Sequence, residues 1–274
     1  MCRLVGYAGP PIALERIVTR PRHSLLRQSQ QAHEAKLAVN GDGFGMAWYT
    51  GEDAEPGLYR DVLPAWSDGN LPSLCRVIRS GLFLAHVRAG TVGGTSRTNC
   101  HPFAHGRWSF AHNGQVADFA RIRRALEAAL PDALYARRQG TTDSELLFLT
   151  MVAHGLDAAP LEAVAATLAL VEGLQGGGAP NRMTCLLSDG ERIIGFRHSG
   201  DGHAPTLYVS RGPLDGGGRA LASEPLDGVA ANWLAVEEDG VVTLTPETVL
   251  VGRLPGRVPM SPPAQDQRTS PRKM

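Results

Sequence analysis

The chain has 274 residues, of which 43% are hydrophobic and 20% are charged. This composition is typical of a globular protein and too apolar for a disordered one, and the length allows one large domain or two small ones. Lys and Arg together number 27, as do Asp and Glu, so the net charge of zero gives no reason to expect nucleic acid or an anionic membrane as a partner.

The predicted secondary structure alternates between short strands and helices. In chain order we expect a strand at 4–7, two helices before residue 40 (the second over 24–39), strands at 44–49 and near 61–64, a helix at 71–79, strands at 82–88 and 108–112, helices at 118–130, 142–154 and 160–174, and strands at 183–188, 192–196, 207–209, 219–223, 232–236 and 249–254. The strand at 82–88 has the strongest pattern because it is almost continuously apolar, which is typical of a strand covered on both faces. Asn113-Gly114 is expected to end one strand, and Asp189-Gly190 to form a hairpin turn.

This order of elements predicts an α+β domain whose sheets are covered by helices. The segment Asn40-Gly41-Asp42-Gly43-Phe44-Gly45 has the glycines of a phosphate-binding loop, but a strand pattern follows it where a dinucleotide fold needs a helix. A turn close to the functional site is therefore the better interpretation. The domain is expected to cover residues 2–254, and residues 255–274, rich in Pro, Gln, Ser, Lys and Arg, are expected to form a disordered tail.

The cysteines and the apolar segments indicate the compartment. Cys2, Cys75, Cys100 and Cys185 are widely spaced and include no C-x-x-C pair, which argues against a zinc or redox motif. Charges and prolines interrupt the N-terminal segment, so it lacks the pattern of a secretory signal, and no apolar run approaches the roughly 20 residues that span a bilayer. We therefore expect a cytoplasmic protein with reduced thiols.

Cys2 is the most informative residue because it directly follows the initiator methionine. If an aminopeptidase removed Met1, one residue would carry both a thiol nucleophile and an amine base. The alternative is that Cys2 is a small apolar residue at the start of a buried strand, since free cysteine is among the most buried residue types. Position 2 alone favours the second interpretation, so a catalytic role depends on support from other polar residues.

Four short polar segments lie at the ends of predicted strands or helices, where a rigid scaffold meets an open loop. They are Cys2-Arg3 and residues 86–91, 112–115 and 140–145. Hydrolysis of an amide by Cys2 would create an oxyanion, which needs fixed hydrogen-bond donors. Asn113-Gly114 could supply a side-chain amide and a backbone N–H, although an ordinary Asn-Gly turn is equally consistent.

Two charged residues could bind the head group of an amino acid. Arg88, at the end of the apolar strand, could bind a substrate carboxylate or pair with a structural one. Asp143 could bind a substrate ammonium, or serve only the first turn of a helix capped by Thr141 or Thr142. Together the two charges, with the nucleophile and the amide acting at the far end of the substrate side chain, describe a site for a γ-glutamyl amide.

In this order the segments resemble the class II glutamine amidotransferases, N-terminal-nucleophile hydrolases whose glutaminase domain begins at a catalytic cysteine. The matching segments are the Met1-Cys2 start, His86-Val87-Arg88-Ala89-Gly90-Thr91, His112-Asn113-Gly114 and Thr142-Asp143-Ser144-Glu145. The resemblance spans residues 2–253. Residues 40–45, 99–103 and 222–226 are similar to a compact, stand-alone branch that includes a γ-glutamyl hydrolase of ergothioneine biosynthesis and a glutathione-degrading subunit.

The resemblance implies a four-layer αββα sandwich and the hydrolysis of a γ-glutamyl amide, glutamine or a γ-glutamyl conjugate, through a Cys2 thioester that releases glutamate. The implied roles are Cys2 as nucleophile with its own α-amine as base, Asn113 and Gly114 as oxyanion hole, Arg88 for the α-carboxylate and Asp143 for the α-ammonium, with Thr91 and His112 as further substrate-binding residues.

Two departures from the family pattern leave alternatives open. Larger members place Arg and Trp before the Ala of the arginine motif, whereas Arg88 is followed directly by Ala89-Gly90, and no synthase domain is expected after residue 254. The chain is therefore expected to be a free-standing hydrolase or the glutaminase subunit of a two-protein amidotransferase or glutathione-degrading complex. A non-catalytic module that binds γ-glutamyl or amino-acid ligands is a third alternative. The leaving group and the oligomeric state are left open.

No metal or cofactor is expected. The spacings of His86, His101, His105 and His112 match no zinc motif, so hydrogen-bonded structural histidines are the better interpretation. Among the remaining cysteines, Cys75 and Cys185 are expected in the core, whereas Cys100 could line the site or only pack beside it.

Overall fold

Two antiparallel β-sheets pack face to face between two layers of helices in the computed structural model, which describes residues 2–90 and 92–257. The first sheet has the strand order β11-β9-β10-β1-β4-β2-β3 and the second the order β13-β12-β8-β7-β6-β5. The first is built from β1 (Arg3–Ala13), β2 (Phe44–Tyr49), β3 (Gly57–Asp61), β4 (Arg79–Val87), β9 (Tyr208–Ser210), β10 (Arg219–Ala222) and β11 (Trp233–Ala235). The second is built from β5 (Phe103–His105), β6 (Trp108–Gln115), β7 (Arg182–Ser188), β8 (Ile193–Ser199), β12 (Gly240–Leu244) and β13 (Val249–Arg253).

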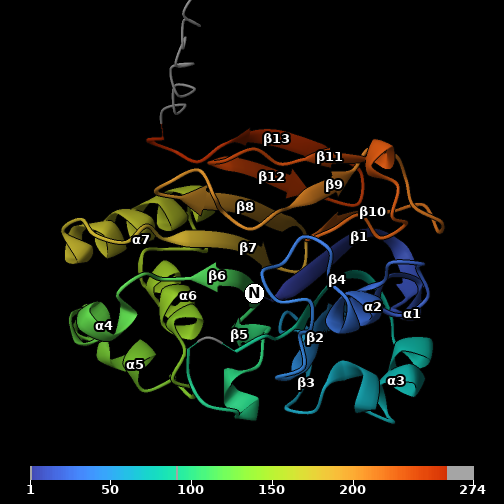
Figure 1. The fold of residues 1–274 in the computed structure, drawn as a ribbon, viewed down its shortest axis with the longest axis horizontal. Coiled ribbons are helices and arrows are strands. Elements are labelled where there is room, and N and C mark those ends of the chain that lie inside the picture. Colours follow the sequence, from blue (N-terminus) through green and yellow to red (C-terminus); the bar gives the residue numbers. More distant parts are fainter. Residues whose placement is uncertain (1, 91, 258–274) are drawn as a thin grey trace, which may run out of the picture.

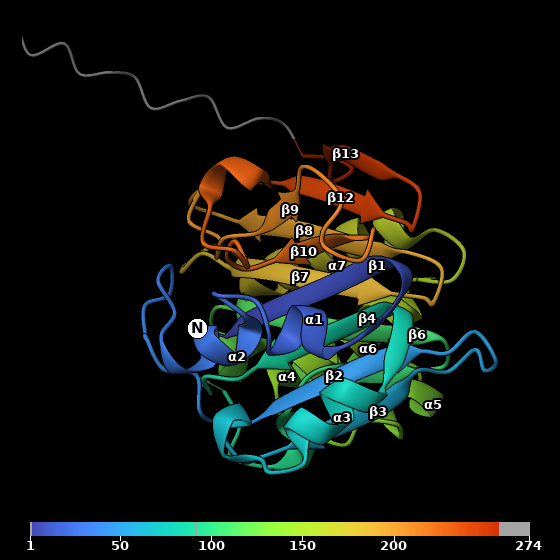
Figure 2. The ribbon, with the colours of Figure 1, turned by 90° about the vertical axis from the view of Figure 1, so that its right-hand side faces the viewer.

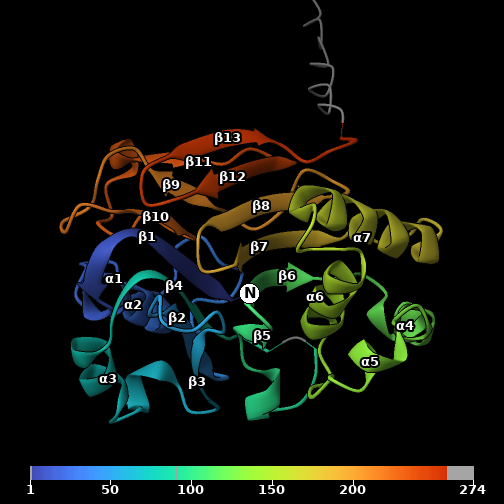
Figure 3. The same cartoon turned by 180° about the vertical axis from the view of Figure 1, so that it is seen from behind.

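The helices divide between the two outer faces of this sandwich. Figures 1 and 3 show α1–α3 beside the first sheet and α4–α7 beside the second, and Figure 2 views the molecule from the side of α1–α3. The helices are α1 (Glu15–Val18), α2 (Leu25–Gln30), α3 (Leu71–Val77), α4 (Phe119–Ala128), α5 (Asp132–Tyr135), α6 (Asp143–Ala153) and α7 (Pro160–Gln175). No described helix is both long enough and apolar enough to cross a membrane.

Three buried apolar clusters fill the three interfaces between the four layers. One joins the inner faces of the sheets, and the other two join each sheet to its helices. Strand β4 shows why its sequence is apolar throughout: Leu82 and Leu84 belong to the cluster between the sheets, whereas Phe83 and Ala85 belong to the cluster under α1–α3. The strand is therefore covered on both faces, as its sequence predicts.

The second predicted helix is much shorter than expected, since α2 ends at Gln30 and residues 31–43 form an irregular loop. Backbone groups in this loop bond outside any helical pattern, because the Ala32 N–H donates to the Ala38 carbonyl and the amides of His33 and Glu34 donate to the carboxylate of Glu224. A bond within the loop and the distant carboxylate of Glu224 thus replace the bonds that a longer helix would have made.

The expectation that Asn113-Gly114 ends its strand is also wrong. Strand β6 continues to Gln115, and Asn113 pairs with Thr184 of β7. Gly114 has φ +123°, and a Cβ atom there would lie 1.9 Å from the carbonyl oxygen of Arg182. Only glycine fits this position, so Asn-Gly here serves the close approach of two strands and not a turn.

The remaining predictions agree with the structure to within a few residues at most element boundaries. Helix α6 begins where expected, and the hairpin at Asp189-Gly190 joins β7 to β8. The short elements β5, α5 and β12 were not predicted. Met1, Thr91 and residues 258–274, most of the predicted tail, lie outside the described residues.

Truncating the core under α6 tests this packing. Phe110 of β6 is fully buried and stacks on Phe148 of α6 with ring centroids 5.4 Å apart. Phe110→Ala should lower the free energy of unfolding in urea by about 3–5 kcal/mol, since it opens a cavity and removes apolar contact. The matched control is Val77→Ala on α3, where the side chain is 64% exposed and a change within about 0.5 kcal/mol is expected. Equal effects of the two substitutions would contradict this arrangement.

Candidate active site

The thiol of Cys2 lies at the head of β1, against the backbone of Ala89. Strand β1 pairs with β4, with Arg3 opposite Val87. Residue 2 therefore lies beside the segment that follows β4. The Ala89 N–H donates to the Cys2 Sγ at 3.4 Å, and the Ala89 carbonyl oxygen lies 3.6 Å from the same sulfur. Burial raises the pKa of Cys2, and the Ala89 amide and the charge of Arg88 oppose that shift without cancelling it. The resting thiol is therefore protonated and needs a base to become a nucleophile.

Arg88 is a buried cation that no described carboxylate neutralises. Within residues 2–90 and 92–257 its guanidinium donates only to backbone carbonyl oxygens, those of Asp42 at 3.3 Å, Val92 at 3.1 Å and Gly93 at 3.3 Å. The side chain forms no ion pair with any carboxylate of residues 2–90 or 92–257, so the structural pairing considered from the sequence does not occur there. Because an uncompensated buried charge is costly, this arrangement suits an anionic ligand.

Asn113 is fully buried, and neither polar atom of its side chain has a hydrogen-bond partner among the described residues. Such a group destabilises a fold by about 1–3 kcal/mol unless water or a ligand satisfies it. Asn113 lies in β6. The residue before it, His112, contacts β4, because its carbonyl oxygen accepts a hydrogen bond from the His86 Nε2 at 3.2 Å. The Asn113 amide is therefore a donor without a partner among the described residues, in the sheet that packs against the one containing β1 and β4.

Asp143, the first residue of α6, makes structural contacts with both of its oxygens. Oδ2 accepts from the Val116 N–H at 2.8 Å, and Oδ1 accepts from the N–H of Ser144 at 2.9 Å. The predicted cap is also present, since the Thr142 hydroxyl accepts from the Glu145 N–H at 3.2 Å. Asp143 thus holds the segment that follows Asn113 and Gly114, whatever else it binds.

His112 faces the same helix, with its Nδ1 2.9 Å from the Ser144 hydroxyl. It belongs to a buried cluster with His86 and His101, whose rings lie 4.2 Å apart. Burial lowers the pKa of all three histidines, that of His86 to about 3, so the cluster is neutral at pH 7. Thr91, the other predicted substrate-binding residue, lies outside the described residues.

Asp42 and Gly43 were placed near the site by their glycine-rich context, and they lie beside Arg88. The Asp42 N–H donates to the Arg88 carbonyl, the Arg88 N–H donates to the Gly43 carbonyl, and the Asp42 carboxylate accepts from the Gly90 N–H at 2.7 Å. The hydrogen bonds from Gly90 to Asp42 and from Ala89 to Cys2 were not predicted, because each joins residues far apart in the sequence.

The other cysteines have structural surroundings. Cys75 and Cys185 are fully buried in the core clusters, as predicted. Cys100 is also fully buried, and its Sγ contacts the carbonyl oxygens of Asp61 at 3.3 Å and Ser96 at 3.5 Å. Cys100 therefore packs beneath the loops around the site.

Comparison with known proteins finds relatives of similar length. The profile of the family described as glutamine amidotransferases class-II matches residues 22–213. The probable glutamine amidotransferase DUG3 of Saccharomyces cerevisiae is 30% identical over 92% of this chain and 84% of its own. The gamma-glutamyl-hercynylcysteine sulfoxide hydrolase of Mycobacterium tuberculosis is 33% identical over 93% of this chain and 97% of its own.

Solved structures give the same result for the fold. A glutamine aminotransferase class-II domain protein from Silicibacter pomeroyi, 35% identical, superposes with a TM-score of 0.72 over 92% of this chain and 99% of its own. The glutamine phosphoribosylpyrophosphate amidotransferase of B. subtilis, only 17% identical, has a TM-score of 0.67 over 94% of this chain and half of its own, a likeness of fold alone. The predicted sandwich fold is thereby confirmed.

The histidine cluster predicts a specific dependence of stability on pH. The unfolded chain takes up a proton at each histidine near pH 6.5, whereas the folded cluster stays neutral, so stability is complete above that pH and falls as the pH drops toward 5. His101→Gln should weaken this fall by up to about 1.4 kcal/mol per pH unit, measured by urea unfolding between pH 7 and 5. His203→Gln, with a side chain 75% exposed, should leave the wild-type slope unchanged. Identical slopes for all three proteins would refute a neutral buried cluster.

Proposed function

The chain belongs to the class II glutamine amidotransferases, and we propose that it hydrolyses a γ-glutamyl amide bond with Cys2 as the nucleophile. The resemblance seen in the sequence is confirmed by the family match and by relatives that align over most of their length. The chain is thus an amidohydrolase of γ-glutamyl amides, and the proposal concerns which residues act and on which substrate.

The observation that carries the proposed site is the contact of Cys2 with Ala89, directly beside the uncompensated cation of Arg88. A γ-glutamyl compound has an α-carboxylate at one end of a short side chain and the scissile carbonyl at the other. Binding of the carboxylate by Arg88 would complete the charge balance of the guanidinium and bring the carbonyl toward the thiol. Asp143 would receive the α-ammonium through lone pairs that its backbone contacts leave free.

In the first step the Cys2 sulfur attacks the γ-carbonyl carbon, and the thiol proton passes to the α-amine of the same residue. The carbonyl electron pair moves to oxygen, and the amide of Asn113 with the N–H of Gly114 would stabilise that oxyanion. The role of Asn113 is supported by its buried amide, which has no hydrogen-bond partner in the described part of the chain. The C–N bond then breaks, and the leaving amine takes the proton from the α-ammonium.

In the second step water attacks the γ-glutamyl thioester. The α-amine accepts a proton from the water, the oxyanion forms again at the same donors, and collapse returns the Cys2 thiol and releases glutamate. The mechanism requires a free α-amine on Cys2 and hence removal of Met1. Intact-mass measurement of the purified protein tests this requirement directly, because a retained Met1 would exclude the amine as base.

The leaving group follows from the relatives only by analogy. One relative is named for γ-glutamyl-hercynylcysteine sulfoxide and another as a probable glutamine amidotransferase. We propose a γ-glutamyl conjugate as the substrate and the cytoplasm as the compartment, where the free thiols would persist. A panel of γ-glutamyl compounds, assayed by glutamate release, ranks the leaving groups. Turnover by the purified chain alone would favour a free-standing hydrolase over a subunit that needs a partner.

Replacing the nucleophile gives the decisive test of function. Cys2→Ala should abolish glutamate release and the covalent γ-glutamyl intermediate, measured by coupled assay and by mass spectrometry after acid quench. The matched control is Cys75→Ala, the same change at a thiol buried in the core beside Met46, which should leave turnover per folded molecule unchanged. Glutamate release by Cys2→Ala at the wild-type rate would sink the proposal.

Removing the amide donor tests the oxyanion hole. Asn113→Ala should lower kcat by about 10²–10³-fold, because one donor to the developing oxyanion is lost. KM should change little, since the donor acts mainly in the transition state. An unchanged kcat, or a rise in KM alone, would assign Asn113 to substrate binding or to structure.

A further inference from the structure

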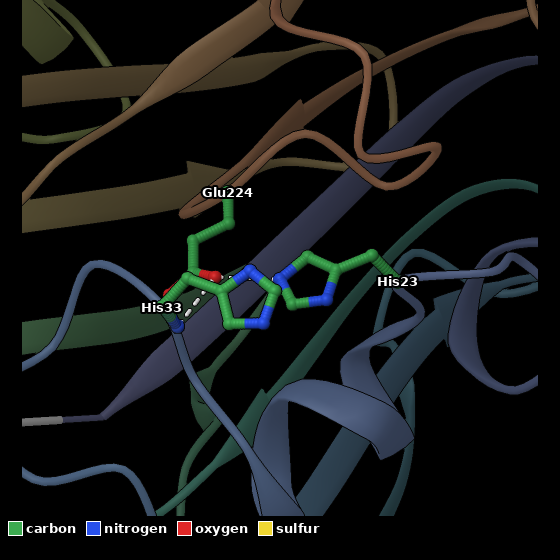
Figure 4. Close-up of side chains that lie close together, drawn as sticks. All are labelled: His23, His33 and Glu224. Carbon is green, nitrogen blue, oxygen red and sulfur yellow. Dashed lines mark hydrogen bonds and ion pairs between the residues drawn. The ribbon is translucent and has the colours of Figure 1, made fainter.

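A single buried carboxylate, that of Glu224, gathers donors from three separate segments of the chain. Glu224 follows β10, and its side chain is 2% exposed. It accepts from Arg3 Nη1 at 3.1 Å, from His23 Nε2 at 2.6 Å, and from the amides of His33 and Glu34 at 3.0 Å each. Figure 4 shows the carboxylate meeting His23 and His33.

The three side chains in Figure 4 lie close enough for a metal site, but their geometry argues against one. Ligand atoms of His23, His33 and Glu224 lie within 4.8 Å of one another. The two imidazole rings are stacked, with centroids 4.3 Å apart and planes only 20° from parallel, whereas a shared ion would have to lie near the plane of both rings. The carboxylate is also saturated by protein donors. We therefore interpret the cluster as structural: the Glu224 carboxylate connects Arg3, His23 and the loop at residues 33–34.

The first segment that this carboxylate binds is the start of β1, where Arg3 connects Glu224 to Cys2. Arg3 is fully buried, and while its Nη1 binds Glu224, its Nε donates to the carbonyl oxygen of Cys2 at 2.6 Å. The planar guanidinium makes both contacts with one rigid group. The neighbouring Ser223 hydroxyl accepts from the Leu4 N–H at 3.0 Å. The segment after β10 thus fixes the backbone on both sides of Arg3.

The second segment is the loop at residues 31–43. The carboxylate of Glu224 binds the amides of His33 and Glu34 near the start of this loop. Its far end, Asp42-Gly43, exchanges backbone hydrogen bonds with Arg88, and the Asp42 carbonyl accepts from the Arg88 guanidinium. The loop therefore connects Glu224 to the residue proposed to bind the substrate carboxylate.

We infer that Glu224 is a positioning residue, which sets the Cys2 thiol and the Arg88 guanidinium relative to each other through Arg3 and the loop at 31–43. This inference rests on the proposed roles of Cys2 and Arg88. Neither Glu224 nor Arg3 reacts: they hold the two ends of the γ-glutamyl site at a fixed separation. Burial opposes ionisation of Glu224, but His23, the two amides and Arg3 together lower the pKa of its carboxyl. Glu224 is therefore charged at pH 7, and its charge matters to the contact with Arg3.

The test compares the wild type with Arg3→Lys, Glu224→Gln and the double variant Arg3→Gln/Glu224→Gln. Glu224→Gln removes one charge and leaves Arg3 buried without a charged partner. The double variant removes both charges, and Arg3→Lys keeps both. Lysine has a single ammonium that cannot reproduce the two-point contact of the guanidinium. The matched control is Asp189→Asn, because Asp189 is likewise buried, pairs with Arg192 at 3.0 Å and accepts from two amides, at the β7–β8 turn.

Each protein is assayed for stability, for the fraction of active sites titrated by a thiol-reactive glutamine analogue, and for kcat and KM on the best γ-glutamyl substrate. We expect kcat per titrated site to fall by up to about 100-fold in Arg3→Lys and in the double variant. The reason is that a displacement of the thiol by about 1 Å from its reactive position has an effect of this size. In Glu224→Gln the KM should rise as well, because the loop that holds Arg88 is loosened. Asp189→Asn should lose stability but keep kcat and KM.

Wild-type kcat in Arg3→Lys would overturn the inference, even if the double variant failed to fold. A loss of kcat matched by Asp189→Asn would also overturn it, since it would then reflect stability alone. The two levels of the argument fail differently. If the wild type shows no glutamate release that depends on Cys2, the proposed function fails, whereas an active wild type with unaffected Arg3 and Glu224 variants refutes only the positioning role.

Discussion

The antiparallel pairing of β1 with β4 is the constraint on which the site depends. Its register sets Leu4 opposite His86 and Arg3 opposite Val87, which brings residue 2 to the segment after β4. Because both faces of the sheet are covered, a slip of one residue would exchange every apolar side chain of β1 between two different cores. The core of the protein, and not a flexible loop, therefore fixes the place of the thiol.

Two of the polar residues identified from the sequence are buried with groups that the described part of the chain leaves unsatisfied. The amide of Asn113 and both ring nitrogens of His101 are buried without a partner among the described residues. Each such group opposes folding, so the two rigid sheets and their helices must over-determine the local structure. A site with donors already in place needs little reorganisation when negative charge develops on a substrate oxygen. In the mechanism that we propose, the Asn113 amide is such a group: it reduces stability in the resting protein and would donate to the oxyanion.

The sequence predicted the elements whose signal is local and missed those that depend on distant partners. The apolar run at 82–88 and the cap at Thr142 were sufficient for β4 and α6. Residues 31–39 were mistaken for helix because amides in this segment bind Glu224, about 190 positions away in the chain. Asn113 was identified as an oxyanion candidate, but the reason its neighbour is glycine, the approach of Arg182, exists only in the sheet. Short edge strands such as β5 lack a sufficient pattern of their own.

The two buried arginines show how the fold divides structural from functional charge. Arg3 and Arg88 both lie near Cys2 and are both almost inaccessible to water, yet only Arg3 has a carboxylate partner among the described residues. Burying either cation would be strongly unfavourable without compensation. For Arg3 the compensation is Glu224, so its charge serves the fold in every state of the protein. For Arg88 the described residues offer only carbonyl dipoles. Its charge is left for an anionic ligand to compensate, which is the part that we propose for the α-carboxylate of the substrate.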